Sequence, residues 1–135
     1  MPSAVALGGA LGCAARYGVA QLVGGRTDAF PWATFWVNLS GSFALGLILV
    51  LILERFPPGR YLRALVATGF LGAYTTYSTF ALETVQLIKA GRAAVALAYV
   101  VASLLAGLVL AWAGMVAARS VVVPALGKAP APPQP

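Results

Sequence analysis

Charge and histidine are what this 135-residue sequence has least of, and their scarcity excludes several classes of function. Only 9% of the residues are charged and none is histidine, whereas a soluble domain carries about 25% charged residues. Without histidine, neither a Ser-His-Asp triad nor a histidine metal site can form. Of the three acids, Asp28, Glu54 and Glu83, only Glu83 lies near a predicted membrane-depth segment, so a single chain lacks the pair that paired-carboxylate catalysis needs. We therefore do not expect an enzyme.

Cysteine is nearly absent as well, and the basic residues are spread thinly. The single cysteine, Cys13, lies in an apolar run and cannot form a disulfide within one chain. Nine basic residues against three acidic ones give a net charge of +6. These bases stand singly between apolar stretches, so a nucleic-acid partner is not expected. Such bases anchor apolar segments at lipid headgroups and favour anions over cations in a pore.

Long apolar segments are what the sequence has most of, because 61% of its residues are hydrophobic. A helix crosses about 30 Å of hydrocarbon with about 20 residues. Charges divide the chain into four segments of about that length, residues 4–23, 31–53, 64–88 and 93–118. The sequence thus predicts an all-α membrane protein, with four transmembrane helices in one domain, residues 1–120. Residues 121–135 are rich in proline and alanine, and we expect them to form a disordered tail.

The basic residues outside these helices give only a weak preference for one orientation in the membrane. If the N-terminus is cytoplasmic, five of them lie on that side, namely Arg55, Arg60, Arg63, Arg119 and Lys128. The other side then has three, namely Arg26, Lys89 and Arg92. Because loop bases set membrane orientation, such a small difference leaves insertion in both orientations open.

Small and polar residues inside the predicted helices recur every four positions, so that they share one helix face. These stripes are Gly8, Gly12 and Arg16 in the first helix, Thr34, Asn38 and Ser42 in the second, and Tyr99, Ser103 and Gly107 in the fourth. One interpretation is helix packing, since small residues allow close approach and polar groups bond between helices. The other is a polar path. On that interpretation Arg16 attracts anions in a water-filled vestibule instead of extending to the headgroups.

The third predicted helix has a segment at which regular coiling should fail. Residues 69–80, GFLGAYTTYSTF, concentrate glycine, threonine and aromatic residues, and glycine and threonine are poor helix formers. Serine and threonine hydroxyls also compete for backbone hydrogen bonds. A break inside a membrane is tolerated only where it lines a cavity or is buried in protein. Freed carbonyls suit a cation, whereas freed amides, hydroxyls and positive ring edges suit a small anion. A tightly packed, merely kinked helix is the alternative.

At this segment the sequence resembles the CrcB/Fluc fluoride channel family, and the resemblance covers nearly all of the chain before the tail. It is carried by GGALG at residues 8–12 with Arg16-Tyr17, by TFWVNLSGSF at residues 34–43, and by residues 69–80 followed by Glu83. The resemblance implies passive export of cytoplasmic fluoride, giving fluoride resistance. It also implies an antiparallel, dual-topology homodimer in the cell (inner) membrane, crossed several times by each chain, with two pores along the interface.

The resemblance further implies a role for individual residues. The fluoride pore residues would be Asn38, Tyr77, Phe80, Ser78, Thr79, Thr34 and Ser103, with Arg16 in the vestibule. A structural Na+ at the dimer centre would be held by the main-chain carbonyls of Gly72 and Thr75. The sequence departs from the family at Tyr77, where phenylalanine is usual, and at Ala73, where the family has its second glycine.

Two other functions remain open at this point. A small multidrug-type transporter also has four membrane spans, but it needs a carboxylate deep in the membrane. The acid available, Glu83, lies toward the end of the third predicted helix. A non-transporting scaffold subunit is the second alternative, in which every polar stripe serves only helix packing.

Overall fold

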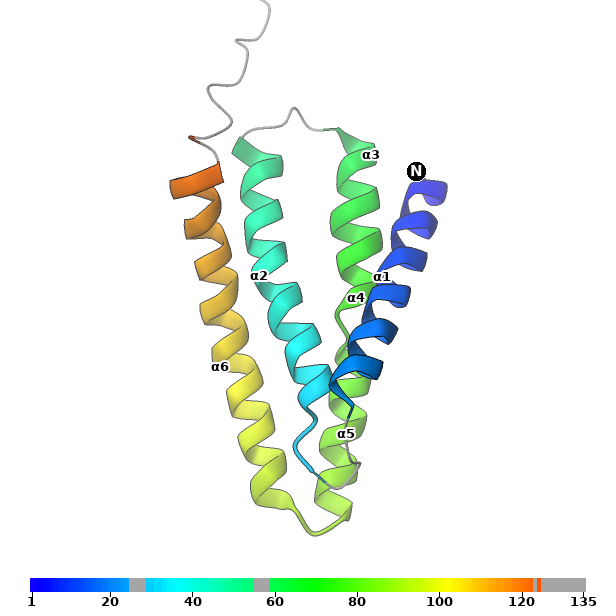
Figure 1. Cartoon of the computed structure of the whole chain (residues 1–135), viewed down its shortest axis with the longest axis vertical. Helices are drawn as coiled ribbons and strands as arrows, with labels where there is room; N and C mark the ends of the chain where they lie inside the picture. The colour runs from blue at the N-terminus through cyan, green and yellow to red at the C-terminus, as the bar shows by residue number, and fades with distance from the viewer. Residues whose placement is uncertain (25–28, 55–58, 123, 125–135) are drawn as a thin grey trace, which may run out of the picture.

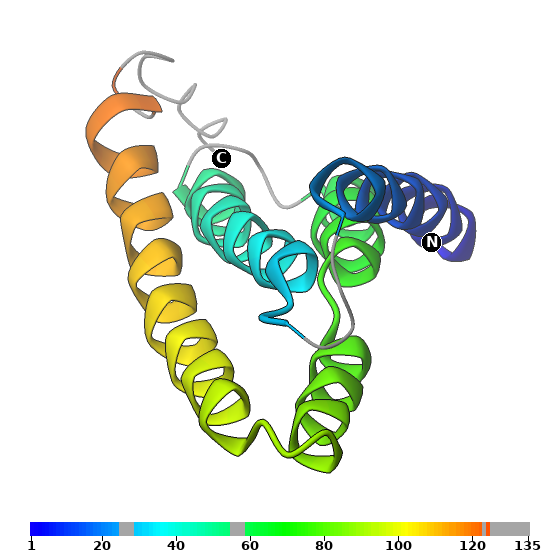
Figure 2. The same ribbon diagram turned by 60° about the horizontal axis from the view of Figure 1, so that its bottom comes forward.

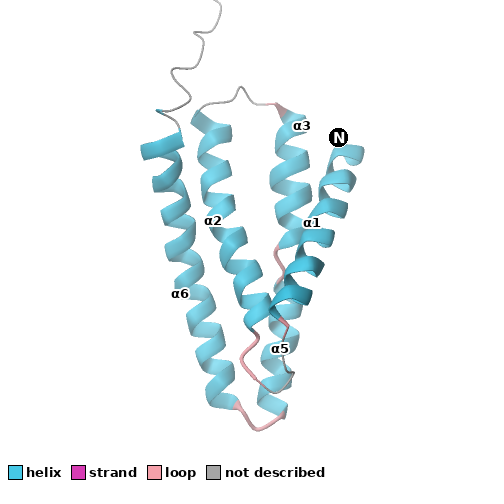
Figure 3. Cartoon of the chain, viewed as in Figure 1, coloured by secondary structure: helices cyan, strands magenta, loops and turns pink. Residues whose placement is uncertain are grey.

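A computed structural model describes residues 1–24, 29–54, 59–122 and 124 of the chain, and within these ranges the protein is helical without any strand (Figure 3). The elements are α1 (Pro2–Val23), α2 (Trp32–Glu54), α3 (Arg60–Leu62), the π-helical segment η1 (Arg63–Leu71), α4 (Gly72–Tyr74), α5 (Tyr77–Lys89), α6 (Ala93–Ala117) and the π-helical segment η2 (Ala118–Val122). The all-α prediction is confirmed. Most of the predicted tail lies outside the described residues, and helix continues into its first two positions.

The helices run roughly along one common direction, with α2 between two neighbours. One neighbour is α6, and the other is the pair formed by α1 and η1 (Figures 1 and 2). The N-terminus and the C-terminal end of α6 lie at one end of the bundle, and the α5–α6 turn lies at the other (Figure 1). Gly91 in that turn has a φ of 74°, a conformation that glycine adopts without steric cost.

Two helices in the described part of the chain are long and apolar enough to cross a membrane, Trp32–Glu54 and Ala93–Val121. They correspond to the second and fourth predicted segments. Helix α1 has 22 residues, a length of about 33 Å, but Arg16 and Gln21 make it less apolar. The third predicted segment is interrupted, and α5, its longest α-helical piece, has 13 residues.

Large apolar side chains cover much of the outer surface. Only 11% of the apolar stretch of the last helix is buried within the chain. Leu97, Leu105, Leu108 and Trp112 are all exposed on it. An apolar surface of this extent is unfavourable in water but is suited to lipid tails or to another apolar chain.

Glycines set the closest helix contacts, as the small-residue stripe in the first helix predicts. A Cβ atom on Gly8 would overlap the Leu65 carbonyl oxygen, and one on Gly12 would overlap the Phe70 carbonyl oxygen. Helix α1 is therefore held backbone-to-backbone against η1. In the same way, a Cβ atom on Gly46 would overlap a carbonyl oxygen of α6, so α2 and α6 also pack closely.

The predicted break in the third helix is confirmed and lies at Thr75 and Thr76 (Figure 3). Thr75 has φ −74° and ψ 155°, and Thr76 has φ −145° and ψ 121°, so both residues are extended. Helix α4 therefore ends at Tyr74 and α5 begins at Tyr77. The π-helical segment η1, which precedes the break, is not predicted by the sequence.

Candidate functional site at the broken helix

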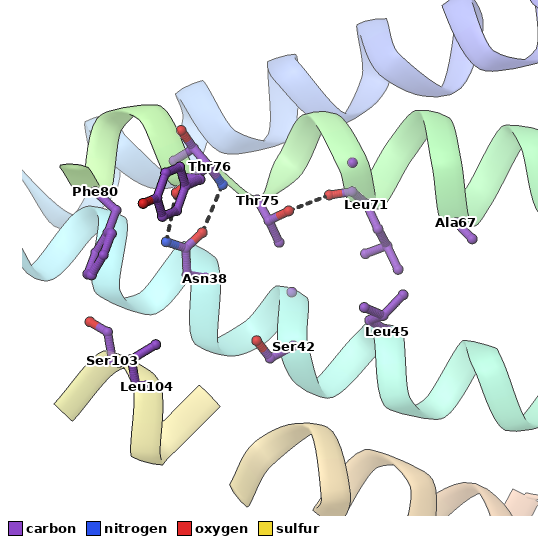
Figure 4. Close-up of a pocket in the computed structure, with 13 residues that line it drawn as sticks. Asn38, Ser42, Leu45, Ala67, Leu71, Thr75, Thr76, Phe80, Ser103 and Leu104 are labelled. Carbon is purple, nitrogen blue, oxygen red and sulfur yellow. Dashed lines mark hydrogen bonds between the residues drawn. The ribbon is translucent and has the colours of Figure 1, made fainter. Parts of the chain in front are cut away.

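The break is held by a reciprocal pair of hydrogen bonds from one side chain on α2. Asn38 Nδ2 donates to the Thr76 carbonyl oxygen at 3.0 Å, and the Thr76 amide donates to Asn38 Oδ1 at 2.8 Å (Figure 4). The amide side chain thus replaces the helical partners that Thr76 lacks. A partly buried asparagine and an extended backbone segment each need a hydrogen-bonding partner, and here each satisfies the other.

Three hydroxyl side chains cluster where α5 begins. Thr76 is the N-cap of α5, and its Oγ1 accepts from the Thr79 amide at 3.2 Å. The same hydroxyl donates to Thr79 Oγ1 at 3.0 Å and lies 3.3 Å from Ser78 Oγ. The first turn of a helix also has free amides and a positive dipole end. The local charge distribution therefore favours an anion near the break.

A cleft of about 400 Å³ opens between α2, the broken helix and α6. We call it the ring cleft because Tyr77 and Phe80 line it, with ring centroids 6.1 Å apart. Asn38, Ser103, Gly72 and Thr75 also line it, so this cleft brings together six of the predicted site residues. Figure 4 shows that these residues come from different helices, with Asn38 on α2, Phe80 on α5 and Ser103 on α6.

Ser103 has an unusual position in the ring cleft. Its Oγ is buried and has no hydrogen-bond partner among the described residues. A buried hydroxyl without a partner is costly. The ring cleft therefore contains at least one neutral donor that no part of the described chain satisfies.

A second cleft of about 400 Å³ lies on the other side of the break. We call it the arginine cleft, because Arg16 of α1 lines it together with Thr34 of α2 and Thr79 of α5. The predicted site residues are thus divided between two clefts. Thr34 shares a helix face with Asn38 in the sequence pattern, yet the two residues line different clefts.

Thr34 is engaged in a network that the sequence analysis did not predict. Thr34 Oγ1 donates to Glu83 Oε1 at 2.8 Å, and the Tyr99 hydroxyl donates to Glu83 Oε2 at 2.8 Å. Tyr99 is fully buried and contacts Phe80, with ring centroids 5.0 Å apart. The sequence indicates that both residues are unusual, because Tyr99 begins the polar stripe of the fourth helix and Glu83 is the single acid of the third. It does not indicate that the two side chains are paired.

Thr76 is the other functional candidate that the sequence analysis missed. It lies inside the hydroxyl-rich segment 69–80, but nothing in the sequence distinguishes it from its threonine neighbours. Its importance depends on Asn38, 38 residues away in the chain. Ser78, by contrast, was predicted as a pore residue and lines neither cleft, although it contacts the Thr76 hydroxyl.

These features define a class of protein: a small, all-helical, apolar chain with a neutral polar cleft at a helix broken in its middle. The family model described as CrcB-like protein, Camphor Resistance (CrcB), matches residues 3–115. The chain therefore belongs to the CrcB-like family.

The similarity of the chain to individual relatives is consistent with this family. The chain is 46% identical to Fluoride-specific ion channel FluC 3 of Streptomyces avermitilis over 117 residues, which is 87% of this chain and 57% of that protein. It is 46% identical to Fluoride-specific ion channel FluC of Paracoccus denitrificans over 115 residues, covering 85% of this chain and 91% of the relative. With Fluoride-specific ion channel FluC of Thermus thermophilus the identity is 48% over 111 residues, covering 82% and 88%. The chain thus spans little more than half of the first relative but nearly all of the other two.

Proposed function

We propose that the protein is a fluoride-selective ion channel, and not an enzyme, that exports cytoplasmic fluoride passively and so gives fluoride resistance. Family membership and the similarity to fluoride-specific ion channels support this function. On this proposal the chain crosses the cell (inner) membrane four times, with α1, α2, the broken helix and α6 as spans. The outward apolar surface supports that placement.

The observation that carries the proposal is the neutral ring cleft at the break. Among the described residues that line it, none is charged; the donors are hydroxyl and amide groups beside two aromatic rings. Fluoride is small and strongly hydrated, so a pore must replace its water with several weak contacts. Binding must also be weak enough for the ion to leave. Hydroxyls, an amide and positive ring edges meet both needs, whereas a lysine or arginine in the cleft would hold the anion.

The antiparallel homodimer is part of this proposal. Tyr77 lines the ring cleft, yet 81% of it is exposed, so one chain alone leaves a pore ring uncovered. A second copy inserted in the opposite orientation would complete that side and would generate two equivalent pores. The weak charge asymmetry of the sequence is compatible with insertion in both orientations.

The residues at the break also fit the proposed sodium ion. In a continuous helix the Thr76 amide would donate to the Gly72 carbonyl oxygen, but here it donates to Asn38. The Gly72 carbonyl oxygen thus loses its helical donor, and Thr75 is extended beside it. Free carbonyl oxygens are suitable ligands for a hard cation. Gly72 and Thr75 of both subunits would hold Na+, which would fix the two breaks against each other.

Ion flux from purified protein in liposomes tests the function. We expect fluoride efflux, followed with a fluoride electrode, and hardly any chloride efflux under the same gradient. Asn38→Ala should lose most of the fluoride flux because the break loses both of its bonds to α2. Phe80→Ile should do the same because the ring edge is lost.

The alternative functions give different results in this assay. Equal fluoride and chloride flux, or no flux of either ion, would contradict the channel. The absence of all transport is the result expected of a scaffold subunit. Uptake of organic cations that depends on a proton gradient would instead indicate a multidrug-type transporter.

A further inference from the structure

The ring cleft and the arginine cleft meet at a single residue. Among the described lining residues, Thr76 is the one that the two clefts share. Asn38 borders the ring cleft, and its neighbour Val37 borders the arginine cleft. An ion that moves between the two clefts where their linings meet therefore passes Thr76.

The Thr76 side chain is suited to contact an ion at this position. It is 7% exposed, so it is held in place and not free in solvent. The two Asn38 bonds fix its backbone, while its hydroxyl remains a rotor with one proton and two lone pairs. The hydroxyl proton is directed at Thr79 Oγ1, 3.0 Å away, and the contact with Ser78 Oγ is longer, at 3.3 Å. Neither of these hydrogen bonds is strong, because both distances are long for a bond between hydroxyls. Rotation of the hydroxyl can redirect the donor without moving the backbone.

We propose that Thr76 is the transfer point of the fluoride pathway, where its hydroxyl donates to the ion as it leaves the arginine cleft and enters the ring cleft. This inference rests on the proposed channel function and adds a residue to its pore. Arg16 in the arginine cleft attracts the anion, and the neutral donors of the ring cleft receive it. Thr76 replaces a water molecule of the ion between them, and the bond from the Thr79 amide keeps α5 capped meanwhile.

Substitutions at Thr76 can separate this role from helix capping. Serine and aspartate are both good N-caps, whereas valine is not. Thr76→Ser keeps the hydroxyl, and we expect fluoride flux within about twofold of the unmodified protein. Thr76→Asp keeps a cap but places a carboxylate on the path, so flux should fall at least about tenfold. Thr76→Val removes the donor at nearly constant size and should also lose most of the flux.

Thr84→Val is the matched control, because it makes the same change within α5, the helix that Thr76 caps. Its Oγ1 donates to the Phe80 carbonyl oxygen, and it lines neither cleft. We expect its flux to be unchanged. Full flux in either Thr76→Asp or Thr76→Val would overturn the transfer point. Absence of flux in the unmodified protein would instead contradict the channel function itself, so the two failures are distinguishable.

A second measurement does not depend on whether these variants fold. Cys13 is exposed and lines the arginine cleft, so a small, negatively charged thiol reagent should attach there and reduce fluoride flux. Cys13→Ala should conduct and be insensitive to the reagent. Complete labelling, verified by mass spectrometry, without loss of flux would place the arginine cleft outside the pathway. Failure of the reagent to reach Cys13 in liposomes would show that this cleft is not hydrated, which also contradicts the proposal.

Discussion

At the scale of single residues, the sequence indicates which side chains matter but not which atoms they contact. Asn38 is costly to bury in a membrane, so the sequence alone indicates that it needs a partner. The partner is the backbone of Thr76, which becomes available only because the helix breaks. The pairing of Glu83 with Thr34 and Tyr99 is equally non-local. Such contacts between distant segments cannot be predicted from residue types and their spacing.

Tyr77 gives the most informative substitution at this scale. Its ring lines the ring cleft beside Phe80, and its hydroxyl makes no hydrogen bond to any described residue. Tyr77→Phe should therefore change the free energy of unfolding by less than about 0.5 kcal/mol. The ring edge remains while one hydroxyl donor is lost, so fluoride should bind more weakly and leave faster.

The measurement for Tyr77→Phe is fluoride flux as a function of fluoride concentration. We expect a higher maximal flux and a higher half-saturating concentration than in the unmodified protein. Tyr77→Ile is the matched comparison, since it removes the ring as well and should lose flux. Lower maximal flux in Tyr77→Phe would mean that the hydroxyl assists permeation instead of slowing it.

At the scale of helices, the apolar segments of the sequence predict where the helices lie, but they do not predict whether a helix is of the α or the π type. The predicted segments 4–23, 31–53 and 93–118 lie close to α1, α2 and α6, because charges and turn residues mark helix ends. The break at Thr75 is predicted by local composition. The π-helical form of η1 is not, since π-helices are rare and nothing in residues 63–71 distinguishes them from an α-helical segment. Close contact with α1 through Gly8 and Gly12 is visible only in three dimensions.

The contact of α1 with the broken helix can be tested with two glycines of α1. A Cβ atom on Gly12 would overlap the Phe70 carbonyl oxygen, whereas one on Gly18 would meet nothing within 4 Å. Gly12→Ala should therefore force the helices apart and destabilise the protein by about 1–3 kcal/mol. Gly18→Ala should be neutral or stabilise it by up to about 1 kcal/mol, because alanine favours helix. Unfolding in detergent measures both changes, and equal stability of the two variants would contradict the packing described for α1.

At the scale of the whole molecule, the distribution of basic residues over the two ends of the bundle governs insertion. Arg60, Arg63 and Arg119 lie toward the end that carries the N-terminus, and Lys89 and Arg92 lie at the α5–α6 turn (Figure 1). Arg119 Nε is paired with Glu54 Oε1 at 2.8 Å, on an exposed surface. An exposed ion pair of this kind contributes little to stability. The charges at the ends therefore matter more for membrane orientation than for the fold.

The proposed antiparallel dimer makes fluoride flux depend on that charge balance. Lys89→Ala with Arg92→Ala removes bases from the turn end, so the N-terminal end should face the cytoplasm in most chains. Arg60→Ala, Arg63→Ala and Arg119→Ala with Ala90→Lys and Ala93→Lys shift the balance strongly the other way, to two bases at the N-terminal end against five at the turn end. Each variant alone then lacks partners of opposite orientation and should give little fluoride flux, although the described pore residues are unchanged.

Co-expression distinguishes lost orientation from lost folding. If the subunits pair antiparallel, the two oppositely biased variants should complement each other and restore flux toward the level of the unmodified protein. Substitutions that merely damage folding cannot be rescued by a second damaged chain. Full flux from a variant whose chains all face one way, as judged by labelling of cysteines introduced at the α5–α6 turn, would exclude the antiparallel dimer. That result would remove the two paired pores from the proposal, but it would leave the ring cleft, whose donors belong to one chain.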